Sequence, residues 1–144
     1  PVLIGNPPKE HKFDLVCEDG RYVGECKNYS WTETGNVPSA KLAFLNEAVF
    51  YLLHLPGDVQ RFVALRRDVH PRRQESLAEF YVRTYYHLLD GVKVIEIDLN
   101  SSIARVIGEG GQAEASRSAK RLAQLGGSEP QLRPIQRIRR ASRR

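Results

Sequence analysis

The most informative pattern of apolar and polar residues lies in residues 12–29, where two apolar, β-branched runs flank Asp19-Gly20. Such a pair predicts a β-hairpin with a type I′ turn, because both central residues of that turn need positive φ. With these two residues as the loop, the register places Asp14 directly opposite Glu25. Side chains then alternate between the two faces. The face that we expect to join the core carries Phe13, Leu15, Cys17, Tyr22, Gly24 and Cys26.

Beyond the hairpin, the apolar spacing predicts a helix and then a strand. Leucine and valine residues recur at intervals of three and four over residues 42–53, which is typical of a helix with one buried face. Pro38 suits the first turn of that helix, and Pro56-Gly57 suits its end. The short apolar run at residues 61–65 predicts a buried strand.

A second helix and one or two further strands follow. Ser76 and Glu79 have the spacing of a capping box, in which each side chain bonds the backbone N–H of the other residue. Residues 92–98 predict a strand, and residues 101–107 predict a weaker one. The order of hairpin, helix, strand, helix and strand indicates an α/β protein with a mixed sheet whose faces are covered by helices.

Composition limits the protein class. The chain has 144 residues, of which 41% are hydrophobic, and this is enough for one packed domain. No apolar run approaches the ~18 residues that span a bilayer, and residues 1–4 lack the features of a signal peptide. The two cysteines and the absence of paired metal-binding motifs favour a reduced, cytoplasmic setting without a structural zinc site.

The positive charge is concentrated at one end of the chain. Residues 110–144 contain nine Lys or Arg and two Glu, whereas residues 1–109 contain thirteen basic and fifteen acidic residues. We therefore divide the chain into a domain at 1–109 and a basic, flexible tail at 110–144 that includes a short helix. The tail suits a polyanionic partner. A solvated tail without a partner is the alternative.

The charged face of the predicted hairpin is the candidate site. Side chains that lie opposite one another in an antiparallel pair are ~5 Å apart, so Asp14 and Glu25 repel unless something offsets their charge. A divalent cation held by both carboxylates does so. Lys27 projects on the same side and can stabilise an oxyanion, or position or deprotonate a water. The alternative is an ordinary edge hairpin with a solvated charged face.

Asp14, ten intervening residues and then Glu25-Cys26-Lys27 resemble the catalytic signature of the PD-(D/E)XK nuclease superfamily. The resemblance implies a restriction-endonuclease-like fold, a mixed β-sheet flanked by helices. It also implies that Asp14, Glu25 and the Cys26 carbonyl bind Mg²⁺, which Mn²⁺ can replace, and that Lys27 is the catalytic lysine. Phe13 stands where the name-giving proline of the motif would be.

The same resemblance implies a metal-dependent endonuclease that hydrolyses phosphodiester bonds in DNA, with no membrane partner and with a homodimer as one arrangement. In such proteins the helix after the motif presents a basic residue to the cleft, here Lys41. Four arginines in one loop region form a second predicted phosphate-binding surface: Arg66, Arg67, Arg72 and Arg73. Trp31 is expected either to stack on a base or to pack half-buried.

Two alternatives to a nuclease remain open at this stage. The superfamily usually carries a further acid on a helix before the first catalytic strand, and residues 1–11 have no helical pattern. A catalytically inactive nucleic-acid-binding domain of the same fold is therefore the first alternative. The second is an unrelated small α/β protein whose basic tail recruits a partner.

Overall fold

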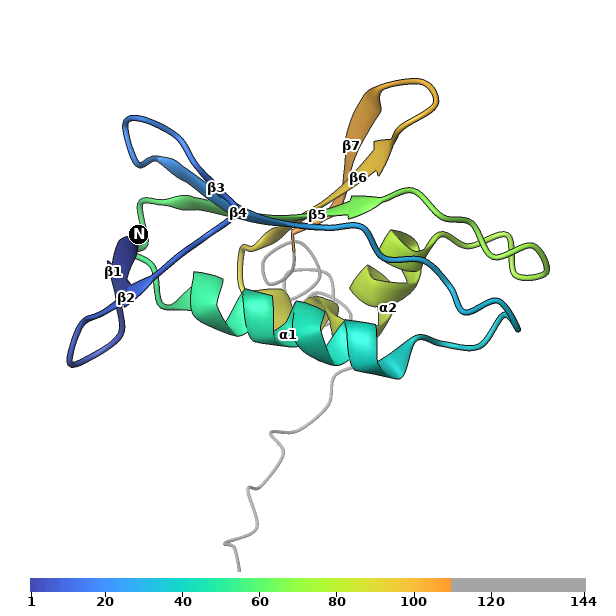
Figure 1. The fold of residues 1–144 in the computed structure, drawn as a ribbon, viewed down its shortest axis with the longest axis horizontal. Helices are drawn as coiled ribbons and strands as arrows, with labels where there is room; N and C mark the ends of the chain where they lie inside the picture. The colour runs from blue at the N-terminus through green and yellow to red at the C-terminus, as the bar shows by residue number, and fades with distance from the viewer. Residues whose placement is uncertain (110–144) are drawn as a thin grey trace, which may run out of the picture.

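A computed structural model of the chain describes residues 1–109, which form a mixed β-sheet and two helices (Figure 1). The predicted basic tail at 110–144, with its short helix, lies outside the described residues. The elements in chain order are β1 (Val2–Ile4), β2 (Lys9–His11), β3 (Leu15–Val16), β4 (Tyr22–Lys27), α1 (Ser39–Leu53), β5 (Gln60–Arg66), α2 (Leu77–Leu89), β6 (Lys93–Asp98) and β7 (Ile103–Gly108).

The main sheet has five strands in the order β3-β4-β5-β6-β7. The three central strands run parallel, and β3 and β7 pair antiparallel at the two edges. Strands β1 and β2 form a separate antiparallel pair. The predicted α/β class and mixed sheet are thus confirmed, and the main sheet follows the predicted element order. Strand β2, in the separate pair, was not predicted.

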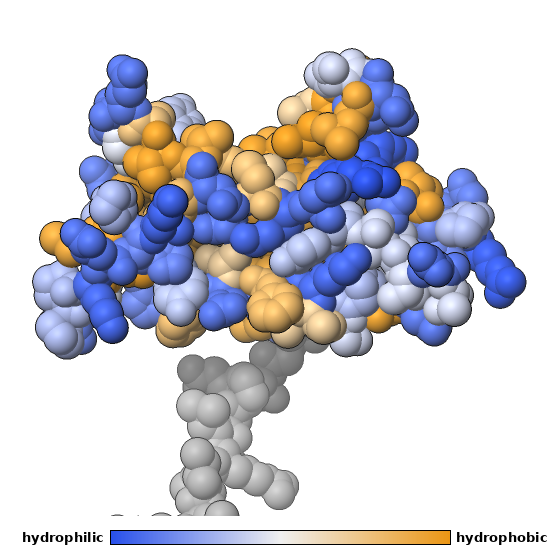
Figure 2. Space-filling view, in the orientation of Figure 1, coloured by the Kyte–Doolittle hydropathy of each residue, from blue (hydrophilic) through white to orange (hydrophobic). Residues whose placement is uncertain are grey.

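Both helices lie on the same face of the main sheet (Figure 1). The connections β4-α1-β5 and β5-α2-β6 step across the sheet in the same direction. Because such connections are almost always right-handed, two steps in one direction put both helices on one side. Our expectation that helices cover both faces was therefore wrong for residues 1–109. On the uncovered face and its edges, apolar residues gather beside β3 and the β6–β7 hairpin (Figure 2).

The one-sided arrangement reverses the predicted core face of the hairpin. Val23 is buried on the covered side, whereas Leu15, Tyr22 and Cys26 are exposed. Phe13 is buried as predicted, but it precedes β3 and does not follow the alternation of a strand. The face that carries the candidate acids is consequently the one that meets the helices.

The hairpin register is confirmed, but the turn differs from the prediction. Leu15 pairs with Gly24, and the next pair follows in the same register. Of the two predicted turn residues only Gly20 has positive φ, at 69°. The carboxylate of Asp19 instead accepts the backbone N–H of Arg21 at 3.1 Å. This side-chain contact stabilises a wider loop with an ordinary φ at the aspartate.

The helix boundaries agree with local signals in the sequence. Ser76 and Glu79 form the predicted capping box, with N···O distances of 2.7 and 3.1 Å. Helix α1 begins after Pro38 and buries the predicted apolar stripe: Leu42, Leu45, Val49 and Leu52. Neither of the two described helices is long and apolar enough to span a membrane.

Candidate active site

Three charged side chains converge where the chain enters β3 and runs antiparallel to β4. Asp14 immediately precedes β3, and Glu25 and Lys27 both belong to β4. The ammonium nitrogen of Lys27 lies 2.6 Å from Glu25 Oε2 and 3.6 Å from Asp14 Oδ2. The backbone N–H of Cys26 donates to Asp14 Oδ2 at 3.0 Å. The three predicted catalytic residues therefore form one cluster.

The cluster is graded from the interior to solvent. The side chain of Glu25 is only 9% exposed, that of Lys27 is 22% exposed, and that of Asp14 is 49% exposed. Val23 lies two residues before Glu25 on β4 and is buried, so the inner end of the cluster adjoins the core. Asp14 forms the outer, accessible end, where a substrate can reach it.

The pKa values of the two acids are shifted in opposite directions. The backbone N–H of Cys26 stabilises the Asp14 carboxylate and lowers the pKa of Asp14. Burial raises the pKa of Glu25, and the nearby Asp14 adds to the rise. Pairs of acids with divergent pKa values are common where a site binds metal or transfers protons.

Lys27 is held in its charged form. Burial favours the neutral amine, but the hydrogen bond and the charge of Glu25, together with the charge of Asp14, outweigh it and raise the pKa of Lys27. A charged ammonium beside two carboxylates suits stabilisation of negative charge on a substrate. It suits proton abstraction poorly in this arrangement, because the amine is not free to accept a proton.

The oxygen donors of the cluster fit a hard divalent cation. Oδ2 of Asp14 and Oε2 of Glu25 are engaged by Cys26 and Lys27, whereas the second oxygen of each carboxylate receives no N–H or ammonium donor from the described residues. Carboxylate oxygens are the ligands that Mg²⁺ prefers. Within residues 1–109 no cluster of three or more His, Cys, Asp or Glu side chains has metal-binding geometry. Such an ion would thus depend on two carboxylates and on backbone or water oxygens.

Cys26 contributes to the cluster through its backbone. Its N–H fixes the orientation of Asp14, and its side chain is exposed on the opposite side of β4. That the Cys26 carbonyl binds a metal remains a prediction.

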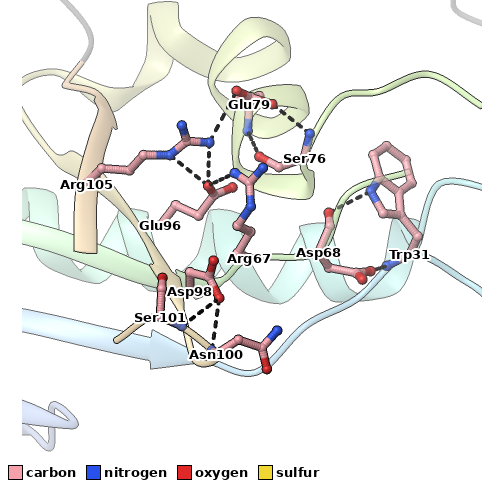
Figure 3. Close-up of polar contacts among 10 residues, drawn as sticks. All are labelled: Trp31, Arg67, Asp68, Ser76, Glu79, Glu96, Asp98, Asn100, Ser101 and Arg105. Atoms are coloured by element: carbon pink, nitrogen blue, oxygen red, sulfur yellow. Dashed lines mark hydrogen bonds and ion pairs between the residues drawn. The ribbon is translucent and has the colours of Figure 1, made fainter. Parts of the chain in front are cut away.

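Two of the predicted phosphate-binding arginines, Arg66 and Arg67, have different surroundings. Arg66 is exposed at the end of β5, on the face opposite Lys27, and contacts Asn28 Oδ1 at 3.4 Å. The guanidinium of Arg67 lies 2.7 Å from Glu96 Oε1 (Figure 3). Because Glu96 is only 1% exposed, its carboxylate requires such a partner. Arg67 therefore supports the fold, whereas Arg66 forms no ion pair among residues 1–109.

The other two predicted arginines, Arg72 and Arg73, are exposed in the loop between β5 and α2. Their backbone N–H groups both donate to His70 Nδ1 at 3.1 Å, and His70 Nε2 lies 2.9 Å from the Gly35 carbonyl oxygen. His70 is buried and both ring nitrogens are occupied, so it organises the loop. The guanidinium of Arg73 lies 5.6 Å from the ring centre of Trp31.

Trp31 packs in the core and is 7% exposed. Its backbone N–H donates to Asp68 Oδ2 at 2.8 Å, and its indole N–H donates to the Asp68 carbonyl oxygen at 3.1 Å (Figure 3). The packing alternative is thus confirmed over base stacking, and the residue is more deeply buried than we expected. It links the loop after β4 to the loop after β5.

Lys41 lies half-buried in the first turn of α1. It forms no ion pair among residues 1–109. The helix begins on the side of the sheet where β4 ends, which is the same end as Lys27 (Figure 1). A role of Lys41 in phosphate binding remains a prediction.

Sequence reasoning missed the ionic cluster around Glu96. Arg105 of β7 donates to Glu96 Oε1 through Nε at 2.9 Å and Nη2 at 2.7 Å, and it lies 3.6 Å from Glu79 (Figure 3). The available signal was the period of two in the predicted strand 92–98, which places Glu96 on the same face as the buried Val94. An acid at such a position indicates a buried ion pair.

Comparisons with known proteins add no relative: no protein-family model, no curated protein and no solved structure matches this chain.

Proposed function

We propose that this protein is a metal-dependent nuclease of the PD-(D/E)XK superfamily, with a restriction-endonuclease-like fold, that hydrolyses phosphodiester bonds in DNA in the cytoplasm. The observation that carries the proposal is the convergence of Asp14, Glu25 and Lys27 at the entry to the β3–β4 hairpin. Two like charges held this close, with one of them buried, are costly for a structural site. A site for a cation and a phosphate uses all three groups.

Each residue has a distinct role in the proposed reaction. Asp14 and Glu25 would hold Mg²⁺ through their oxygens. A bound ion would polarise the scissile phosphate and lower the pKa of an attacking water. The ammonium of Lys27 stabilises the negative charge that develops on the phosphate oxygens in the transition state. Cys26 keeps Asp14 oriented through its backbone N–H.

The arrangement of elements is compatible with the proposed superfamily fold. The acids lie on an antiparallel hairpin, α1 follows the strand that carries Glu25 and Lys27, and β5 then pairs parallel with that strand. Arg66, Arg72 and Arg73 are exposed and can hold the phosphate backbone.

A catalytically inactive DNA-binding domain of the same fold is the second candidate. Residues 2–11 form the β1–β2 hairpin, so within residues 1–109 no helix precedes the candidate acids. Such a helix often supplies a further acid in the superfamily. An inactive domain would keep DNA binding while cutting nothing.

The test compares Lys27→Ala with Lys93→Ala in a plasmid-nicking assay with Mg²⁺, with Mn²⁺ and with EDTA. Lys93 is a matched control because it is a partly exposed lysine of the same sheet, at 38% side-chain exposure, on the opposite face. We expect Lys27→Ala to reduce nicking roughly 100- to 1,000-fold, the effect of losing one group that stabilises transition-state charge. Nicking by Lys93→Ala should equal that of the wild type. DNA binding by both variants should be unchanged.

The outcomes separate the candidates. Nicking by the wild type that disappears with EDTA and with Lys27→Ala supports the nuclease. DNA binding without nicking by the wild type in either metal supports the inactive domain. Full nicking by Lys27→Ala would refute the assignment of the catalytic lysine.

A further inference from the structure

A pocket of about 430 Å³ lies between β2 and the last turns of α1. Its lining includes Lys9 and His11 from β2 and Phe50, Tyr51 and His54 from α1. In Figure 1 this is the end of the molecule where the β1–β2 pair meets the C-terminal end of α1. The volume falls within the ~300–1,000 Å³ of pockets that bind small organic groups.

The pocket is lined by flat rings. His11 stacks on Tyr51 with ring centres 4.1 Å apart and an angle of 25° between the planes. Phe50 lies 4.6 Å from His54 and 5.9 Å from Tyr51. Phe50 is nevertheless 58% exposed, so much of a large aromatic ring at this end of the helix is left without a packing partner. Such a platform suits another planar, aromatic group.

The polar groups of the pocket add the other half of the recognition. Lys9 is exposed on the rim and can pair with a phosphate. A ring platform with a cation at its rim matches a nucleotide, which joins a flat base to an anion. A purely apolar ligand would leave Lys9 unused.

The pocket also lies at a suitable distance from the candidate acids. His11 precedes Asp14 by three residues, so the two Cα atoms are no more than about 11 Å apart even in a fully extended chain. A DNA strand advances ~3.4 Å per nucleotide in a duplex. His11, on the wall of the pocket, is thus within about three nucleotides of a phosphate bound next to Asp14 and Glu25.

We infer that this pocket binds an unpaired base of the substrate strand, close to the bond that is cut. The inference rests on the proposed nuclease function and specifies its substrate: a single-stranded or locally unpaired strand. A paired base cannot enter, since both of its faces are stacked inside the duplex and its edge is engaged by the partner base.

Phe50→Ala and Phe44→Ala form the test pair. Both residues belong to α1 and are similarly exposed, at 58% and 59%, but Phe44 does not line the pocket. Affinity for a fluorescent single-stranded DNA oligonucleotide is measured by anisotropy with the full chain in EDTA, where no cleavage occurs. Loss of one stacked base lowers affinity by about 5- to 150-fold. We expect this loss for Phe50→Ala and none for Phe44→Ala.

Salt dependence and a second probe sharpen the result. Stacking releases no counterion, so the loss in Phe50→Ala should be the same factor at low and high salt, in contrast to a phosphate contact. Adenosine monophosphate should compete only weakly with the oligonucleotide. If the mononucleotide binds as tightly as the oligonucleotide and Phe50→Ala abolishes both, the pocket serves free nucleotides and the inference is overturned.

The inference and the proposed function fail independently. Equal affinity of Phe50→Ala and the wild type would overturn the base pocket, even if Lys27→Ala abolishes cleavage. Normal cleavage by Lys27→Ala together with a selective binding loss in Phe50→Ala would overturn the catalytic assignment and leave the pocket standing. Thermal unfolding of both phenylalanine variants confirms that each is folded.

Discussion

Replacing Glu25 by Gln tests whether this buried acid serves a reaction or the fold. The side chain is 9% exposed and its Oε2 lies 2.6 Å from the ammonium of Lys27. Gln keeps the size of Glu and an oxygen that can accept the same hydrogen bond. The substitution therefore removes the charge of the side chain and little else.

The expected change in the free energy of unfolding is small because two effects oppose each other. A hydrogen bond to a charged group contributes ~1.5–3 kcal/mol and one between neutral groups ~0.5–1.5 kcal/mol, so the contact with Lys27 weakens by about 1 kcal/mol. Removing the charge also removes the cost of burying a charged group and the repulsion by Asp14. Both effects raise the pKa of Glu25. We expect a net change within about 1 kcal/mol.

The raised pKa of Glu25 fixes how this change depends on pH. The folded protein binds the Glu25 proton more tightly than the unfolded chain, in which the pKa has its ordinary value of 4.5. The contribution of Glu25 to stability is therefore fully present below pH 4.5 and is lost as the pH rises through the folded-state pKa. Gln does not titrate, so the stability of Glu25→Gln relative to wild type should improve from acidic to neutral pH.

The assay is urea unfolding of both proteins in EDTA at acidic and neutral pH, paired with the nicking assay in Mg²⁺. We expect near-equal unfolding midpoints at neutral pH and a loss of nicking of at least roughly 100-fold. A Glu25→Gln protein that is destabilised by more than about 2 kcal/mol but still cuts DNA would show that Glu25 is a structural partner of Lys27. The reasoning about the site would then be wrong.

Two further pairs of variants test the structural assignments. Arg67→Ala should lower the urea midpoint, because the buried Glu96 loses one of its partners, and it should leave the salt dependence of DNA binding unchanged. Arg66→Ala should keep the urea midpoint and reduce the slope of log affinity against log salt concentration by about 1. The reverse pattern would identify Arg67 as the phosphate ligand. Leu45→Ala, at a fully buried position of α1, should lower the free energy of unfolding by ~2–5 kcal/mol. Phe44→Ala on the exposed side of the same helix should not, and an equal loss in both would contradict the assigned core face of α1.

Local patterns in the sequence predicted the parts of the fold that depend on neighbouring residues. The capping box at Ser76 and Glu79 and the leucine stripe of α1 formed as expected, because both depend on spacing within one helix. The pairing of Leu15 with Gly24 also followed from the position of the turn. The turn itself did not, since the Asp19 side chain stabilised a different backbone conformation.

The cluster of Asp14, Glu25 and Lys27 could be predicted for the same reason. Glu25 and Lys27 are two residues apart on one strand, so their side chains lie on the same face. The register of the hairpin places Asp14 opposite Glu25. The surroundings of Arg67 could not be predicted, because its partner Glu96, which also binds Arg105, lies on a strand that becomes a neighbour only when the sheet assembles. The same holds for the pocket, which joins β2 to the far end of α1.

The sequence by itself determined which segments become the two helices and the strands of the main sheet, the register of the β3–β4 hairpin and the grouping of one lysine with two acids, because these follow from contacts along or across adjacent segments. Only the tertiary structure decided which face of that hairpin is buried. Alternation along a strand distinguishes two faces but does not identify the inner one. That choice was made by the direction in which successive strands add to the sheet, which places both helices on the face that carries Val23 and Glu25 and leaves Leu15 and Tyr22 exposed.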